Sequence, residues 1–129
     1  MSKRRVLVVD DDVNLARLAG MILESSGKYE VMIVHESARA LAAAVQFRPD
    51  AMLLDIDMPG KSGAELAEDA TRDARLREVP VLFLTGLVSR SEAGKAPLES
   101  GGKRFLAKPV EPRLLLAQVD RLIAEASAA

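Results

Sequence analysis

Short runs of consecutive apolar residues alternate along the chain with longer segments in which apolar residues recur at helical spacing. The runs are residues 6–9, 31–34, 51–54, 81–84 and, more weakly, 105–107. None of them alternates with polar residues, which is typical of parallel strands buried under helices on both faces. We therefore expect five strands of one parallel sheet.

The segments between these runs carry apolar residues at positions i, i+3, i+4 and i+7, the pattern of one helix face. The expected buried stripes begin at Leu15, Ala38, Gly63 and Leu115, and the first stripe includes Leu18. Asp12 or Asn14 can cap the first helix, and Pro112 suits the first turn of the last. The alternation predicts a doubly wound α/β domain, with a five-stranded parallel sheet flanked by five helices.

The fourth of these helices has the weakest sequence support. Its segment, residues 88–99, contains Gly94 and Pro97, and a proline inside a helix costs about 3 kcal/mol. The pair Gly101-Gly102 follows directly. We expect this helix to be short, kinked or mobile.

Length and charge narrow the function classes. The 129 residues fit one domain, so we expect residues 1–129 to form it, with no output domain visible. Basic and acidic residues number 18 and 19, a net charge of −1, which offers no broad basic field for nucleic acid. The absence of cysteine excludes disulfides and thiolate metal sites. No apolar run reaches the ~18 residues of a membrane span, and a cytoplasmic location is expected.

Polar side chains follow four of the five apolar runs directly. They are Asp10, Asp11 and Asp12 after the first run, Asp55 and Asp57 after the third, Thr85 after the fourth and Lys108 after the fifth. In an open parallel sheet, ligands bind outside the carboxyl ends of the strands. Carboxylate oxygens suit Mg²⁺, while an ammonium and a hydroxyl suit a phosphoryl group that a carboxylate could accept. We assign Asp12 to helix capping instead.

These residues, in this order and spacing, resemble the receiver domain of bacterial two-component response regulators, the family that includes the chemotaxis regulator. The segments that carry the resemblance are residues 8–11, 53–59 with Gly63, 79–86 and 105–109. The resemblance covers nearly the whole chain. It implies a flavodoxin-like fold with strand order 2-1-3-4-5.

The resemblance also implies the site. Asp55 matches the phosphoacceptor, which takes a phosphoryl group from a histidine of a sensor kinase. Asp10, Asp11 and Asp55 match the acidic residues that hold Mg²⁺, and the backbone carbonyl of Asp57 matches a further metal ligand. These four residues are our predicted metal site.

Three further residues, all later in the chain than the third apolar run, complete the resemblance. Lys108 matches the lysine that pairs with the phosphoryl group, before a peptide bond to Pro109 that is usually cis. Thr85 matches the hydroxyl that moves toward the phosphate. Phe105 is either the aromatic switch residue of the family or an ordinary core residue.

A receiver is a phosphorylatable switch, and we expect no enzyme activity beyond self-phosphotransfer and slow autodephosphorylation. The implied partners are a sensor histidine kinase or phosphotransfer protein and a downstream protein on the face of the fourth helix, fifth strand and fifth helix. A phosphorylation-dependent dimer is also implied. We expect neither nucleic acid nor membrane as a direct partner.

One alternative is a Mg²⁺-dependent phosphohydrolase of the haloacid dehalogenase type, because Asp55-Ile56-Asp57 resembles the nucleophile and acid pair of that family. Against it, the pair Asp10-Asp11 precedes this motif, and the chain is short for such an enzyme. A receiver that no longer cycles is a third hypothesis. His35 ends the second run, and we expect it at the sheet edge, on the surface and away from the acidic residues.

Overall fold

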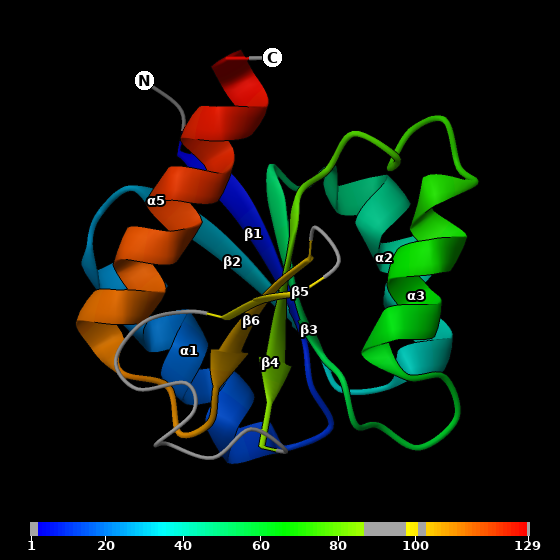
Figure 1. Cartoon of the computed structure of the whole chain (residues 1–129), viewed down its shortest axis with the longest axis horizontal. Coiled ribbons are helices and arrows are strands. Elements are labelled where there is room, and N and C mark those ends of the chain that lie inside the picture. The colour runs from blue at the N-terminus through cyan, green and yellow to red at the C-terminus, as the bar shows by residue number, and fades with distance from the viewer. Residues whose placement is uncertain (1–2, 87–97, 101–102, 129) are drawn as a thin grey trace.

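One six-stranded sheet, covered by helices on both faces, organises the chain (Figure 1). The computed structural model describes residues 3–86, 98–100 and 103–128. The strands are β1 (Arg4–Val9), β2 (Tyr29–Val34), β3 (Ala51–Asp55), β4 (Val81–Thr85), β5 (Leu98–Ser100) and β6 (Lys103–Ala107). The helices are α1 (Val13–Ser25), α2 (Ser37–Phe47), α3 (Gly63–Thr71) and α5 (Pro112–Ala128). In Figure 1, α1 and α5 lie on one face of the sheet, and α2 and α3 lie on the other.

The strand order is β2-β1-β3-β4-β6-β5. The first five strands in this order pair in parallel, and they are the five apolar runs in the predicted order 2-1-3-4-5, with β6 as the fifth. The predicted fold class is therefore confirmed. Strands β1 and β3 are buried along most of their length, whereas β2 is half-exposed because it forms an edge.

The predicted fourth helix needs a correction. Most of its segment lies outside the described residues, but Leu98 and Glu99, which we expected at its end, belong to strand β5. This strand pairs antiparallel with β6, with Ser100 opposite Lys103. The described residues thus hold four helices rather than five.

Local side-chain hydrogen bonds fix where the helices begin. Asp12 caps α1, because its Oδ1 accepts from the amide of Leu15 at 3.1 Å. Ser62 and Glu65 form a capping box at the start of α3: each side chain accepts from the amide of the other residue at 3.2 Å. Helix α1 therefore begins after a three-residue loop (10–12) that follows β1, and α3 begins after a seven-residue loop (56–62) that follows β3.

Two apolar cores fill the spaces between the sheet and the helix layers. The core under α1 and α5 includes Leu23 and Val119, and the core under α2 and α3 includes Leu54 and Leu66. The predicted stripe of α1 is wrong at Leu18, whose exposed fraction is 44%. Helix α1 instead turns Ala16, Ala19, Gly20, Ile22 and Leu23 toward the core.

A polar contact links the beginning of β2 to α5. The Tyr29 hydroxyl donates to Asp120, which also accepts from Lys28 Nζ at 2.7 Å. Burial and the Asp120 carboxylate both raise the pKa of Tyr29. Burial opposes ionisation of Asp120, but its two hydrogen-bond donors lower its pKa overall. Within the described residues, no helix is both long and apolar enough to cross a membrane.

Candidate functional site

The ends of four neighbouring strands bring the predicted site residues together. Asp10 follows β1, Asp55 and Thr85 end β3 and β4, and Lys108 follows β6. Backbone hydrogen bonds continue past the strand ends: Asp10 donates to Val34 at 3.1 Å, and Lys108 donates to Thr85 at 2.9 Å. The backbone of each residue is therefore held by the sheet, as the positional argument from the sequence requires.

Three carboxylates form a compact acidic cluster. One oxygen from each of Asp10, Asp11 and Asp55 lies within 4.8 Å of the others. Asp10 and Asp55 are buried, with exposed fractions of 0% and 2%, whereas Asp11 is exposed. The cluster is therefore anchored in the protein on one side and open to solvent on the other.

The donor set of this cluster fits a hard divalent cation. Asp10 Oδ1 accepts from the amide of Asp12 at 2.9 Å, while the buried Asp10 Oδ2 has the Lys108 ammonium, 3.2 Å away, as its charged partner. Three carboxylates this close together carry more negative charge than one ammonium offsets, and a divalent cation would compensate for the rest. Oxygen-only ligands are those that Mg²⁺ prefers.

Lys108 bridges the two buried carboxylates. Its Nζ lies 3.0 Å from Asp55 Oδ1 and 3.2 Å from Asp10 Oδ2. Burial acts to lower the pKa of Lys108, but the two carboxylates outweigh it and the pKa is raised. Burial is also the main reason that the pKa of Asp55 is raised; the Asp10 charge adds to it and the Lys108 ammonium opposes it. Lys108 is therefore favoured in its charged form beside a buried carboxyl group whose ionisation is disfavoured.

Asp57 lies beside the cluster but its carboxylate is not part of it. Its amide donates to Asp55 Oδ1 at 3.3 Å, and its side chain is exposed. The nucleophile and acid pair of the phosphohydrolase alternative is therefore not assembled around Asp55, and that alternative is not favoured. A metal-binding role for the Asp57 carbonyl stays a prediction.

Gly63 lets α3 begin directly against the backbone of Asp55. A Cβ at this position would lie 2.3 Å from the backbone oxygen of Asp55, far inside van der Waals contact. The Gly63 amide also donates to the carbonyl of Ile56 at 3.2 Å. Any larger side chain would have to push the start of α3 away from the β3 end, so the glycine is a steric requirement of the site.

Thr85 and the two phenylalanines lie on one side of the sheet. Side chains two positions apart on a strand share a face, so Thr85 and Phe83 point to the same side. Phe83 is opposite Phe105 in the β4–β6 register, and their ring centroids are 5.3 Å apart in a stacked arrangement. Thr85 is buried and Phe105 half-buried. Thr85 and the stacked rings of Phe83 and Phe105 thus share one face of the sheet.

His35 is nearer to the site than expected. It is exposed, as predicted, and follows the edge strand β2, but its Nδ1 lies 3.1 Å from the backbone oxygen of Asp10. The expectation that it lies away from the acidic residues is wrong. Because β2 pairs with β1, the residue after β2 comes next to the residue after β1, a relation implied by strand order 2-1-3-4-5.

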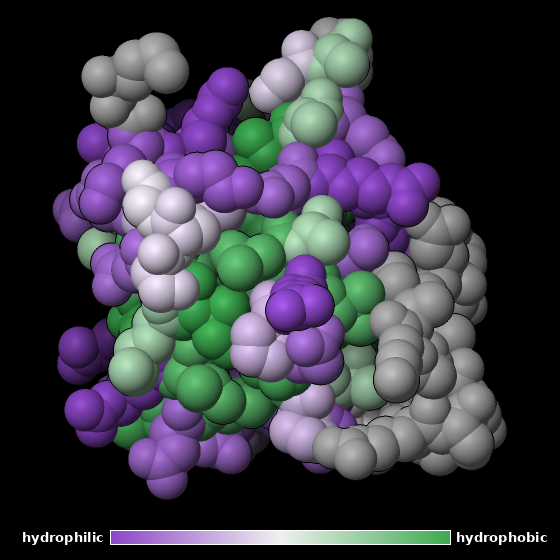
Figure 2. Space-filling model, turned by 90° about the vertical axis from the view of Figure 1, so that its left-hand side faces the viewer, coloured by the Kyte–Doolittle hydropathy of each residue, from purple (hydrophilic) through white to green (hydrophobic). Residues whose placement is uncertain are grey.

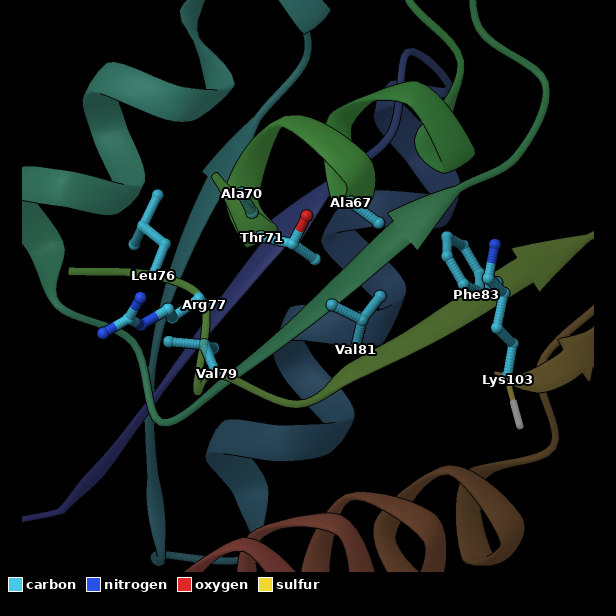
Figure 3. Close-up of a pocket in the computed structure, with 9 residues that line it drawn as sticks. All are labelled: Ala67, Ala70, Thr71, Leu76, Arg77, Val79, Val81, Phe83 and Lys103. Atoms are coloured by element: carbon cyan, nitrogen blue, oxygen red, sulfur yellow. The ribbon is translucent and has the colours of Figure 1, made fainter. Parts of the chain in front are cut away.

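A separate pocket of about 180 Å³ lies between α3 and strands β4 and β6 (Figure 3). Its lining is mostly apolar and includes Ala67, Val81 and Phe83, with Arg77 and Lys103 as its two cations. Lys103 Nζ lies 6.0 Å from the centre of the Phe83 ring. None of the acidic cluster residues lines this pocket, so it is distinct from the candidate site.

Comparison with known proteins agrees with the geometry. A solved receiver domain protein described as CheY-like, from Methanospirillum hungatei, has a TM-score of 0.80 and 30% identity, and each chain is covered over 98% of its length. The receiver domain of a sensor histidine kinase from Pseudomonas aeruginosa, solved with magnesium in its active-site cleft, has a TM-score of 0.78 and 25% identity. That match covers 95% of this chain and 99% of the solved one.

Curated relatives are longer. The DNA-binding response regulator MtrA of Mycolicibacterium paratuberculosis is 32% identical over 117 residues, which are 91% of this chain and 50% of the relative. The chain therefore spans about half the length of that protein. The sequence model of the family described as "Response regulator receiver domain" matches residues 6–120. Together with the strand order and the acidic cluster, this match shows that the chain belongs to the response regulator receiver domain family.

Proposed function

We propose that the chain is a phosphorylation switch in which Asp55 accepts a phosphoryl group from a phosphohistidine of a sensor histidine kinase or a phosphotransfer protein. The observation that carries the proposal is the position of Asp55: it is buried at a strand end, with Asp10 and Asp11 in the same cluster and the Lys108 ammonium 3.0 Å away. A carboxylate held this way is oriented toward an incoming group and is neutralised on one side.

In the proposed transfer, a carboxylate oxygen of Asp55 attacks phosphorus, the bond from phosphorus to the histidine nitrogen breaks, and an acyl phosphate forms. The leaving imidazole nitrogen keeps the electron pair and takes a proton. Autodephosphorylation restores the free carboxylate: water attacks phosphorus, the P–O bond to Asp55 breaks, and inorganic phosphate leaves. Lys108 would pair with the phosphoryl oxygens in place of the free carboxylate.

Asp10, Asp11 and Asp55 would hold Mg²⁺, with the Asp57 carbonyl as a further ligand. When bound, the ion supplies positive charge that offsets the carboxylates and the phosphoryl oxygens. The excess of negative charge in the cluster, three carboxylates beside one ammonium, supports this assignment. In the protein itself, Lys108 provides the only cation that the described residues place within salt-bridge distance of Asp10 and Asp55.

Thr85 and Phe105 would carry the signal from the site. Thr85 can turn its hydroxyl toward a phosphoryl oxygen, and Phe105 packs on Phe83, which shares the face of Thr85. The predicted output surface of fourth helix, fifth strand and fifth helix lies partly outside the described residues. A downstream protein on that surface, a cytoplasmic location and the absence of nucleic-acid contacts stay predictions.

The test uses acetyl phosphate with Mg²⁺ and intact-protein mass spectrometry. The wild type should gain one phosphoryl group, which should be absent in Asp55→Asn and after chelation of Mg²⁺. Asp57→Asn is the matched control, because it makes the same change two residues away on an exposed side chain and keeps the backbone carbonyl that is the predicted metal ligand; it should still gain the group. Labelling of Asp55→Asn, or none of the wild type, would contradict the proposal.

Turnover separates a switch from a hydrolase. The wild type with Mg²⁺ and p-nitrophenyl phosphate should release no more than about one equivalent of nitrophenol per protein in the time of the labelling experiment. Release of many equivalents, lost in both Asp55→Asn and Asp57→Asn, would instead support the phosphohydrolase alternative.

A further inference from the structure

A shallow apolar groove lies between α1 and the edge strand β2, apart from the acidic cluster. It has a volume of about 200 Å³ and is lined by Arg17, Gly20, Met21, Glu24, Val31 and Ile33. Figure 2 looks onto the face that α1 and α5 cover, where hydrophobic residues gather in a patch with hydrophilic ones around it. None of the lining residues belongs to the proposed phosphorylation site.

At the centre of the groove, the protruding apolar side chain of Met21 lies next to Gly20, which has no side chain. Met21 has an exposed fraction of 68%, the largest of the exposed bulky apolar residues among those described. Gly20 lies beside it and packs against β2: a Cβ there would be 3.2 Å from Ile33 Cδ1 and 3.5 Å from Val31 Cγ1. A glycine inside a helix costs about 1 kcal/mol relative to alanine, so the close approach of α1 to β2 on the floor of the groove is maintained against helix propensity.

Opposite charges stand at the two ends of the groove. Arg17 lies one turn before Met21 and Glu24 lies about one turn after it. Neither side chain takes part in an ion pair within the described part of the chain. The two are separated by about 10 Å along the helix axis, from a rise of 1.5 Å per residue, so they cannot pair with each other.

This arrangement is self-complementary under a two-fold rotation. If two α1 helices cross antiparallel with the axis between positions 20 and 21, Met21 of each copy faces Gly20 of the other. The same rotation places Arg17 of each copy against Glu24 of the other. An isologous contact requires a patch that complements itself, and here both shape and charge do.

We propose that the occupant of this groove is a second copy of the chain, in a symmetric dimer formed by α1 and β2. The small area of the groove makes the association weak, because stable specific interfaces bury more than about 1,000 Å² in total. The proposal goes beyond the phosphorylation switch. This dimer does not depend on Asp55, unlike the phosphorylation-dependent dimer that the family resemblance implies.

The test is sedimentation equilibrium of the wild type and variants over a range of concentrations. Met21→Glu places a charged side chain of each copy in the apolar groove of the other and should weaken association at least about tenfold. Leu18→Glu is the matched control: it makes the same kind of change at an exposed apolar residue of α1 outside the groove, and association should be unchanged. Circular dichroism checks that each variant retains the fold.

Charge reversal gives an independent readout. Arg17→Glu alone sets glutamates at positions 17 and 24 against each other and should weaken association, as should Glu24→Arg alone. The double variant Arg17→Glu/Glu24→Arg restores opposite charges and should recover most of the affinity. High salt should weaken its self-association as much as that of the wild type.

Several outcomes would overturn the dimer. They are a wild type that stays monomeric up to millimolar concentration, equal effects of Met21→Glu and Leu18→Glu, and a double variant as weak as the single ones. Asp55→Asn should dimerise like the wild type. A failure of the dimer would leave the labelling result at Asp55 untouched, so the two proposals are tested separately.

Discussion

The Lys108 ammonium lies 3.0 Å from Oδ1 of Asp55, and the same nitrogen contacts Asp10 at 3.2 Å. One cation therefore bridges two buried carboxylates at the ends of different strands. A phosphoryl group arriving on Asp55 brings new oxygen atoms to that cation, so Lys108 has a partner both before and after transfer. The ammonium is a structural element of the unphosphorylated domain as well as a candidate phosphate ligand.

Lys108→Ala should destabilise the domain because it leaves two buried carboxylates without their cation. We expect the free energy of unfolding in urea, measured without divalent cations, to fall by about 1–3 kcal/mol; the partial exposure of Lys108 keeps the loss below that of a fully buried pair. Added Mg²⁺ should narrow the difference from the wild type, since it supplies positive charge at the same carboxylates.

A surface ion pair is the control for that experiment. Lys61 pairs with Asp69 on α3, and the Lys61 side chain is 50% exposed. Lys61→Ala should change stability by less than about 1 kcal/mol and should not respond to Mg²⁺. Equal losses in the two variants would show that the Lys108 bridge has no special role.

Asp55→Asn should stabilise the domain at neutral pH. Burial and Asp10 raise the folded-state pKa of Asp55 above its unfolded value, so the ionised carboxylate reduces stability once the pH exceeds the unfolded pKa. Asparagine removes that cost, and a gain of about 1 kcal/mol would raise the melting temperature by about 4 °C. Because the wild-type carboxylate is protonated in acid, the two melting temperatures should converge as the pH falls toward 4. A constant difference at all pH values would contradict the assigned cause.

Single substitutions should show that the neighbouring residues Asp11 and Asp12 have different roles. Asp11→Asn removes a cluster carboxylate that faces solvent and should weaken Mg²⁺ binding, measured by calorimetry, by about tenfold or more. Asp12→Ala removes the cap of α1 and should lower stability by about 1 kcal/mol while leaving Mg²⁺ affinity unchanged. Loss of Mg²⁺ binding in Asp12→Ala with the fold intact would place Asp12 in the metal site.

Gly63→Ala tests the contact between α3 and the acceptor strand. The new Cβ would meet the backbone of Asp55, which cannot turn aside as a side chain can, so we expect a loss of at least about 2 kcal/mol and slower phosphorylation. Gly20→Ala, where the nearest atom is the flexible end of Ile33, should cost less when stability is measured at low protein concentration. Similar losses for both would contradict the steric argument.

The sequence predicted the parts of this molecule that depend on chain order. Five apolar runs and the residues directly after them placed Asp10, Asp55, Thr85 and Lys108 at one edge, because parallel strands share the direction in which they end. The sequence-based prediction was wrong where tertiary packing determines which face of a helix is buried. Leu18 fits a helical stripe by spacing, but the orientation of α1 between β2 and α5 leaves it exposed.

Strand β5 shows a different limit. A three-residue strand has too little periodicity to be separated from a helix end by its sequence. The distance of His35 from the site depended on which strands are neighbours, a tertiary fact that apolar periodicity does not contain. For Asp57, the family resemblance suggested a metal ligand at the backbone carbonyl, and the structure adds that its carboxylate is exposed and lies outside the acidic cluster.

The two borders of the sheet differ in length and in strand direction, as far as the chain is described. One border is β2, six residues long and parallel to its neighbour, and the other is β5, three residues long and antiparallel. Short border strands offer few free peptide groups to a foreign strand, whereas a longer one offers a continuous row. Intermolecular strand pairing, including the first step of aggregation, should therefore begin at β2. Covering the adjacent α1 groove with a second copy would shield the more vulnerable border of the molecule.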